Sequence, residues 1–196
     1  LLTIAALCAA AFAAGFVDAV VGGGGLIQLP ALLVLLPSTP VPSLLGTSKL
    51  SGISGTASAA ASYARRDVEI RWRVILPAAI AAAAMSWFGA HSVSRLPREA
   101  MRPLVLVLLV LVAACTFVRK DFGALRGPQR APRTELLIAV VGGAVIGFYD
   151  GFFGPGTGSF WTIALVVVMG FNFARATGVT KVMNATSNLA ALGFFV

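Results

Sequence analysis

The sequence predicts an all-α, polytopic transmembrane protein, because of its composition, its long apolar segments and an internal repeat. Of its 196 residues, 58% are hydrophobic and 11% are charged, whereas soluble domains have about 45–50% apolar and about 25% charged residues. Such a chain has too few polar side chains to coat a water-soluble globule. The apolar segments are continuous and of helical length, which is typical of membrane helices.

Eight apolar segments are expected to be helical, and they fall at 1–21, 26–37, 42–63, 74–93, 103–118, 136–153, 158–171 and 176–196. A helix needs about 20 residues to cross the hydrocarbon core, so 26–37 and 158–171 are short. A glycine-rich break, at 22–25 and at 154–158, precedes each short segment. Freed backbone groups are tolerated at membrane depth only where they are buried in protein or line a wet cavity. The breaks therefore indicate a site.

The net charge of +8 comes from 15 Lys and Arg against 7 Asp and Glu. Connections 64–73 and 119–133 carry nine basic residues together, four and five, while 94–102 carries three. Cytoplasmic loops are richer in Lys and Arg, so we expect the first two connections in the cytoplasm and the third outside. Membrane orientation thus accounts for the positive charge, and no nucleic-acid partner is expected.

A shift of 132 residues superimposes two segments of the chain without a gap. Nine positions between 15 and 49 are then identical, including Asp18 with Asp150 and Lys49 with Lys181. These matches are informative because the chain has only four Asp and three Lys. We expect a first transmembrane repeat over 1–132 and a truncated second repeat over 133–196. By the logic of repeats in transporters, the complete protein would be roughly 60–70 residues longer.

The glycine breaks leave two topologies open. If each break is the tip of a helical hairpin, a repeat has five membrane segments and the two repeats are inverted. If each break only kinks one long helix, a repeat has four segments and the repeats are parallel. Arg175, in a connection that inversion would place inside, and the uncharged connection 37–43 outside favour inversion.

Four ionisable residues, Asp18, Lys49, Asp150 and Lys181, lie within apolar segments. Each costs about 2.5–3.5 kcal/mol at a helix centre, so we expect them to face one another or a wet cavity. They would be either structural Asp–Lys pairs or parts of a site for a small oxyanion. In the second case the lysines and the helix starts bind the anion. Asp18 and Asp150 would carry protons in a coupled cycle, or balance the lysines when the site is empty.

The candidate substrate-binding residues share positive charge, hydroxyl or amide donors, or backbone N–H groups at the breaks. They are Gly22, Gly23, Gly24, Gly25, Thr47, Ser48, Lys49, Gly154, Gly156, Thr157, Thr180, Lys181, Asn184 and Asn188. No cofactor or metal is expected, and no Ser/His/Asp, Cys/His or HExxH arrangement indicates an enzyme. The alternatives to a transporter are an anion channel with the same site and a membrane assembly subunit with structural Asp–Lys pairs.

Two copies of Gly-Phe-x-Asp-x-x-x-Gly-x-Gly, each followed by Gly-x-[Ser/Thr]-Lys, resemble the sulfite exporter TauE/SafE family of membrane permeases. The resemblance covers essentially the whole chain. It implies a multi-pass carrier of the cell inner membrane that moves sulfite, sulfonates or related sulfur-containing organic anions, usually outward. The second copy has Val179 in place of Thr47 and Pro155 in place of Gly23, so an asymmetric site is expected. Alternating access would come from one repeat rocking against the other.

Overall fold

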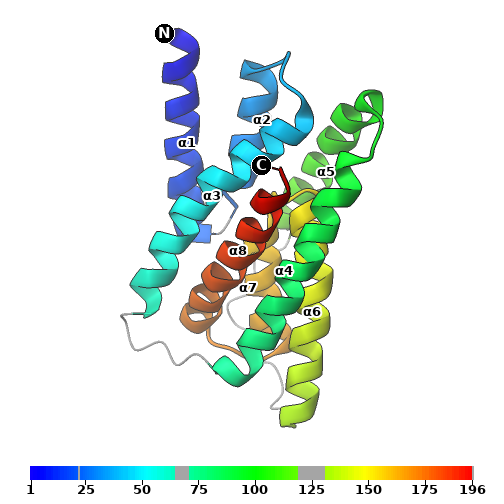
Figure 1. Ribbon diagram of the computed structural model, residues 1–196. Coiled ribbons are helices and arrows are strands. Elements are labelled where there is room, and N and C mark those ends of the chain that lie inside the picture. The colour runs from blue at the N-terminus through cyan, green and yellow to red at the C-terminus, as the bar shows by residue number, and fades with distance from the viewer. Residues whose placement is uncertain (22, 65–70, 119–130, 196) are drawn as a thin grey trace.

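The computed structural model describes residues 1–21, 23–64, 71–118 and 131–195, and all regular structure among them is helical (Figure 1). The helices are α1 (Leu2–Val21), α2 (Gly25–Leu35), α3 (Val41–Ala64), α4 (Trp72–Ser94), α5 (Arg98–Val118), α6 (Pro132–Phe152), α7 (Thr157–Ile163), continued by a π-helical segment (Ala164–Val168), and α8 (Phe173–Phe195). Each expected apolar segment corresponds to one helix, and the all-α prediction is confirmed for the described residues.

Local sequence explains where several helices begin and end. α6 starts with Pro132, which needs no hydrogen-bond partner in a first turn, and has Glu135 in that turn, where the helix dipole favours a carboxylate. α5 begins at Arg98, five residues before the apolar segment, because Glu99 is favourable in its first turn. The π-helical segment ends before Gly170, whose φ of 70° is a left-handed conformation that favours glycine.

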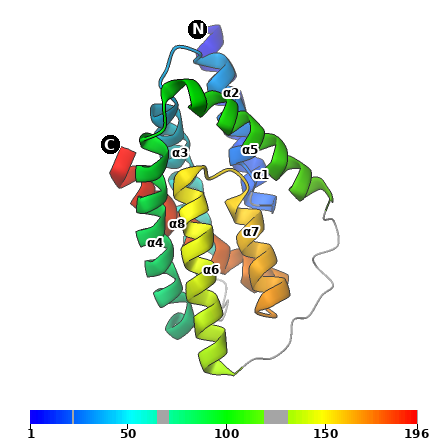
Figure 2. The ribbon, with the colours of Figure 1, turned by 90° about the vertical axis from the view of Figure 1, so that its right-hand side faces the viewer.

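Both glycine breaks are tips at which the chain reverses direction. α1 and α6 approach the middle of the molecule from opposite ends, and α2 and α7 return toward those ends (Figures 1 and 2). The tips meet, since a Cβ atom on Gly25 would lie 3.1 Å from the Cα atom of Pro155. The structure thus has two helical hairpins with touching tips, and neither break is a kink within one long helix.

A stripe of glycines brings α6 against α4. A Cβ atom on Gly143, Gly147 or Gly151 would collide with the α4 backbone at Ala78, Ala82 and Ser86, respectively. Small residues allow such close backbone approach between membrane helices. The Ser86 hydroxyl also donates to the main-chain oxygen of Ser187, 2.7 Å away, and so connects α4 with α8. Among the described residues, α4 and α6 are the most extensively packed pair of helices.

The helix ends lie at two opposite ends of the molecule. α3 ends, and α4, α6 and α8 begin, at the lower end in Figure 1, whereas the α2–α3 and α4–α5 connections lie at the upper end. At the lower end Arg71 and Glu135 form an ion pair, with 3.0 Å between Nη1 and Oε2. Most of the two basic connections, 65–70 and 119–130, lies outside the described residues.

Large apolar side chains cover much of the outer surface. Ile80, Phe88, Val110, Leu137 and Val145, from α4, α5 and α6, are all more than half exposed. Within the described part of the chain, α4 and α6 are long and apolar enough, by length and composition, to cross a membrane. α3 and α8 have 24 and 23 residues, but hydroxyl and amide side chains lower their hydropathy.

Candidate functional site

The first buried ion pair connects α3 with α6. Lys49 Nζ lies 2.7 Å from Asp150 Oδ1 and also donates to the main-chain oxygen of Asp150. The two side chains are only 5% and 3% exposed. The Asp150 carboxylate has two more neighbours, because the Thr157 hydroxyl lies 2.9 Å from Oδ1 and the Ser187 hydroxyl donates to Oδ2 at 2.5 Å. This carboxylate is therefore held from three helices.

A glycine makes the approach of Lys49 possible. Gly154 has a φ of 97°, which favours glycine, and a Cβ atom there would lie 2.7 Å from Lys49 Nζ. The α6–α7 tip thus needs Gly154 both for its backbone conformation and for the space that the lysine occupies. The glycine-rich break at 154–158 therefore makes room for the Lys49–Asp150 ion pair.

The second ion pair connects α8 with α1. Lys181 Nζ lies 2.9 Å from Asp18 Oδ2 and 2.5 Å from the main-chain oxygen of Asp18. The Lys181 side chain is 1% exposed, whereas that of Asp18 is 25% exposed. The amide of Gly24 points toward Asp18 Oδ1 at the longer distance of 3.4 Å. Asp18 thus has fewer and longer contacts than Asp150.

The pairs cross between the two sequence repeats. The lysine of the first repeat pairs with the aspartate of the second, and the lysine of the second pairs with the aspartate of the first. Reciprocal contacts of this kind are what a two-fold relation between two similar units produces. The four ionisable residues thus form two Asp–Lys pairs. All four residues also line one cavity.

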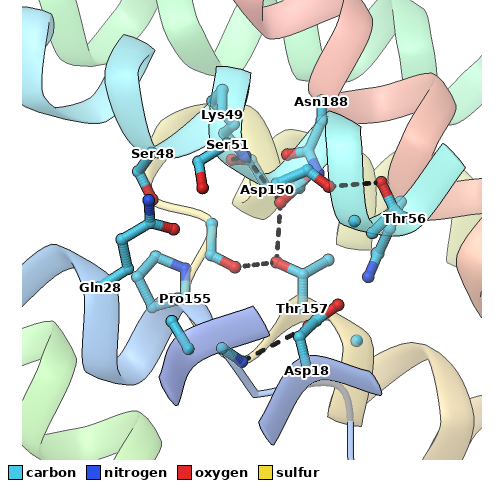
Figure 3. Close-up of a pocket in the computed structure, with 18 of the residues that line it drawn as sticks. Asp18, Gln28, Ser48, Lys49, Ser51, Thr56, Asp150, Pro155, Thr157 and Asn188 are labelled. Atoms are coloured by element: carbon cyan, nitrogen blue, oxygen red, sulfur yellow. Dashed lines mark hydrogen bonds and ion pairs between the residues drawn. The ribbon is translucent and has the colours of Figure 1, made fainter. Parts of the chain in front are cut away.

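A cavity of about 110 Å³ is lined by all four residues of the two ion pairs, and Figure 3 shows Asp18, Lys49 and Asp150 around it. A cavity of about 10–15 Å³ already holds one water, so this space is large enough for a small ion together with several waters. Its lining comes from both tips and from α1, α3 and α8: Ala14, Gly15, Asp18, Gly24, Gly25, Gln28, Leu45, Ser48, Lys49, Ser51, Gly52, Gly55, Thr56, Ala59, Asp150, Phe153, Gly154, Pro155, Gly156, Thr157, Gly158, Lys181, Asn184 and Asn188.

The structure brings most of the candidate residues together at this cavity. Those that line it are Asp18, Gly24, Gly25, Ser48, Lys49, Asp150, Gly154, Gly156, Thr157, Lys181, Asn184 and Asn188. Thr47 is exposed and its hydroxyl donates to the main-chain oxygen of Ser43, while buried Thr180 contacts the Thr162 hydroxyl at 3.2 Å. Gly23 is buried but does not line the cavity, and Gly22 lies outside the described residues.

The start of α2 directs most of its amide groups at the protein's own oxygen atoms. In α2 the amides of Leu26, Ile27 and Gln28 bond to carbonyls of Gly23 and Gly24 within the same tip. The amide of Gly24 is directed at the protein's own Asp18 carboxylate. Positive charge in the cavity therefore comes mainly from the two lysines.

Four polar residues at or beside the cavity were not among the sequence candidates. Gln28, Ser51 and Thr56 line it, and Ser187 donates to Asp150. Helical spacing could have identified three of them, because residues three, four, seven or eight apart share a helix face. Ser51 and Thr56 are near neighbours of Ser48 on this criterion, and Ser187 is three residues after Asn184.

One buried polar atom points to a ligand or water in the cavity. Among the described residues, Asn184 Oδ1 is buried without a hydrogen-bond partner, and Asn184 is 5% exposed. Unsatisfied polar atoms are costly inside proteins and are usually satisfied by water or a bound molecule. Because Asn184 lines the cavity, a water molecule or another hydrogen-bond donor there would satisfy this oxygen.

Similar proteins are named as membrane transporters. The chain is 38% identical over 193 residues to a probable membrane transporter protein, ORF9, of a Sinorhizobium species, covering 98% of this chain and 72% of that protein. It is 35% identical over 196 residues to a probable membrane transporter protein of Haemophilus influenzae, covering 98% of this chain and 74% of the relative. The corresponding values for the probable membrane transporter protein YfcA of Escherichia coli are 35% over 190 residues, 95% and 67%.

No solved structure matches the chain. The family model described as sulfite exporter TauE/SafE matches residues 7–196. This match confirms the resemblance inferred from the repeated motifs, and the relatives' names agree with a membrane transporter and do not point to an enzyme. The chain therefore belongs to the sulfite exporter TauE/SafE family of membrane transporters.

Proposed function

We propose that this protein is a multi-pass secondary transporter of the cell inner membrane, which moves sulfite or small sulfonates, in the direction of export. The anion occupies the cavity between the two repeats, and alternating access comes from one repeat rocking against the other. The observation that carries this proposal is the pair of crossed ion pairs, Lys49–Asp150 and Lys181–Asp18, on one small cavity.

The arrangement of the helices supports inverted repeats. Corresponding helices of the two repeats, α1 with α6 and α3 with α8, run in opposite directions (Figure 1). Inverted repeats place substrate sites near the membrane midplane, at the interface of the repeats and beside discontinuous helices. The two touching tips, with the cavity beside them, support such an arrangement here.

The chemistry of the cavity supports a small oxyanion as substrate. Lys49 and Lys181 line the cavity, and so do the hydroxyl-bearing Ser48 and the amide-bearing Asn184 and Asn188. Sulfite and sulfonates present several oxygen acceptors at short spacing, which suit ammonium and hydroxyl donors. The relatives' family name supplies the sulfur class, and the geometry supports the size and charge.

The two carboxylates are proposed to couple transport to ions. With both pairs intact, two lysines balance two aspartates, so an arriving anion meets no net positive charge. Protonation of Asp18 or Asp150 would remove one negative charge from beside the cavity, so proton binding and anion binding would be coupled. The same carboxylates balance the lysines when the site is empty.

The test is uptake of radiolabelled sulfite, and of a small sulfonate, into proteoliposomes with the full-length protein. Wild type is compared with Lys49→Ala and Lys181→Ala, and Arg71→Ala serves as a matched loss of positive charge at the end of the bundle. We expect saturable uptake with counterflow, lost in both lysine variants and kept in the control. Current without saturation would indicate a channel, and absence of transport of either compound by folded wild type would contradict the proposal.

A further inference from the structure

The two ion pairs correspond in the repeat but are held differently. The Asp150 carboxylate contacts Lys49 and the hydroxyls of Thr157 and Ser187, and its side chain is 3% exposed. The Asp18 carboxylate contacts one side chain, Lys181, and has the Gly24 amide at 3.4 Å. Its side chain is 25% exposed.

The sequence contains the reason for this difference. With the shift of 132 residues, Thr157 corresponds to Gly25 and Ser187 corresponds to Gly55. The first repeat thus has glycines at the two positions whose hydroxyls hold Asp150 in the second repeat, and both glycines line the cavity. A Cβ atom on Gly55 would meet nothing within 4 Å, so the space of the missing side chain is open.

Building on the proposed anion transport, we propose that Asp18 is a built-in competitor of the substrate. Its carboxylate occupies Lys181 while the site is empty and leaves Lys181 when an anion binds, whereas Asp150 remains on Lys49. Lys181 is then the lysine that binds the transported anion, and Lys49 holds the α6–α7 tip. The two lysines, equivalent in the sequence motif, have different tasks.

Electrostatics in the cavity favour this division of tasks. Asp18 is faced by Lys181 from α8 and, across the cavity, by Lys49 from α3 and Asp150 from α6, while α2 and α7 contain no charged residue. An anion that takes a lysine must displace a carboxylate, because each lysine is already paired. Displacing Asp150 would also break its contacts with two hydroxyls, whereas the described part of the chain gives the Asp18 carboxylate no hydroxyl contact. Asp18 is also the more water-accessible carboxylate, so its displaced form keeps more of its hydration.

The test compares the equilibrium binding of sulfite by wild type and two variants of the full-length protein, each purified in detergent. Asp18→Asn removes the competing charge, and we expect it to bind sulfite about tenfold more tightly than wild type, the effect of one hydrogen bond to a charged group. Asp150→Asn is the matched variant in the other pair, and no gain in affinity is expected from it. Equal or weaker binding of sulfite by Asp18→Asn would overturn the proposal.

Absence of sulfite binding and uptake in wild type would count against the proposed function, whereas a wild type that binds sulfite better than Asp18→Asn would count against the competing role of Asp18 alone.

Discussion

Removal of the Asp150 carboxylate should destabilise the protein strongly. In Asp150→Ala the ammonium group of Lys49, on a side chain 5% exposed, keeps only a main-chain carbonyl as partner. Leaving one partner of a buried ion pair unpaired costs about 3–5 kcal/mol. At about 2–4 °C per kcal/mol for a chain of this size, the melting temperature should fall by roughly 6–20 °C.

A double variant separates the contribution of the Lys49–Asp150 ion pair to stability from that of the Asp150 side chain alone. Lys49→Met in the Asp150→Ala background removes both charges and keeps an unbranched side chain, so most of the lost stability should return. Melting of detergent-purified protein can be followed by tryptophan fluorescence, because Trp161 is buried in the α4–α6–α8 region. The reasoning is refuted if Asp150→Ala melts within about 2 °C of wild type, or if the double variant is no more stable than the single one.

Three further predictions concern packing, one hydrogen bond and one surface pair. Gly151→Ala places a methyl group against the α4 backbone and should lower the free energy of unfolding by about 1–3 kcal/mol. Gly142→Ala, with nothing near its Cβ position, should be neutral or stabilising, and equal melting temperatures of the two variants would contradict this. Ser187→Ala removes a donor to Asp150 and should cost about 1.5–3 kcal/mol by thermal melting, and an unchanged melting temperature would show that the hydroxyl does not hold the carboxylate. Arg71→Ala breaks an ion pair whose arginine side chain is 54% exposed, so a loss of stability above about 1 kcal/mol would be unexpected.

Much of the fold could be predicted because membrane helices are defined by long apolar segments. The ends of α1, α3 and α4 lie within two residues of the expected segments. The glycine breaks predicted the hairpin tips but could not distinguish a tip from a kink, since both interrupt a helix in the same way. That distinction depends on which helices pack together, as α4 does on α6, and such contacts join residues far apart in the sequence.

The candidate site was predicted in part for a similar reason. Rare ionisable residues in apolar sequence identified Asp18 and Lys49, because burial of a charge needs a compensating partner. Which aspartate each lysine meets could not be predicted, since the crossed pairing comes from the relation between the repeats. Thr47 and Ser48 are adjacent, but consecutive residues of a helix point in different directions, and only Ser48 lines the cavity.

Anomalous diffraction can test directly whether a small oxyanion binds between the repeats. The crystals would contain the full-length protein and be soaked in selenite. Selenite has the shape and charge of sulfite, and selenium marks its position. We predict one anomalous peak in the cavity, within about 4–5 Å of Lys181 Nζ, given hydrogen bonds of about 2.7–3.2 Å through selenite oxygen, with Asp18 turned away from that lysine. A peak elsewhere, with both ion pairs intact and transport demonstrated, would contradict the account.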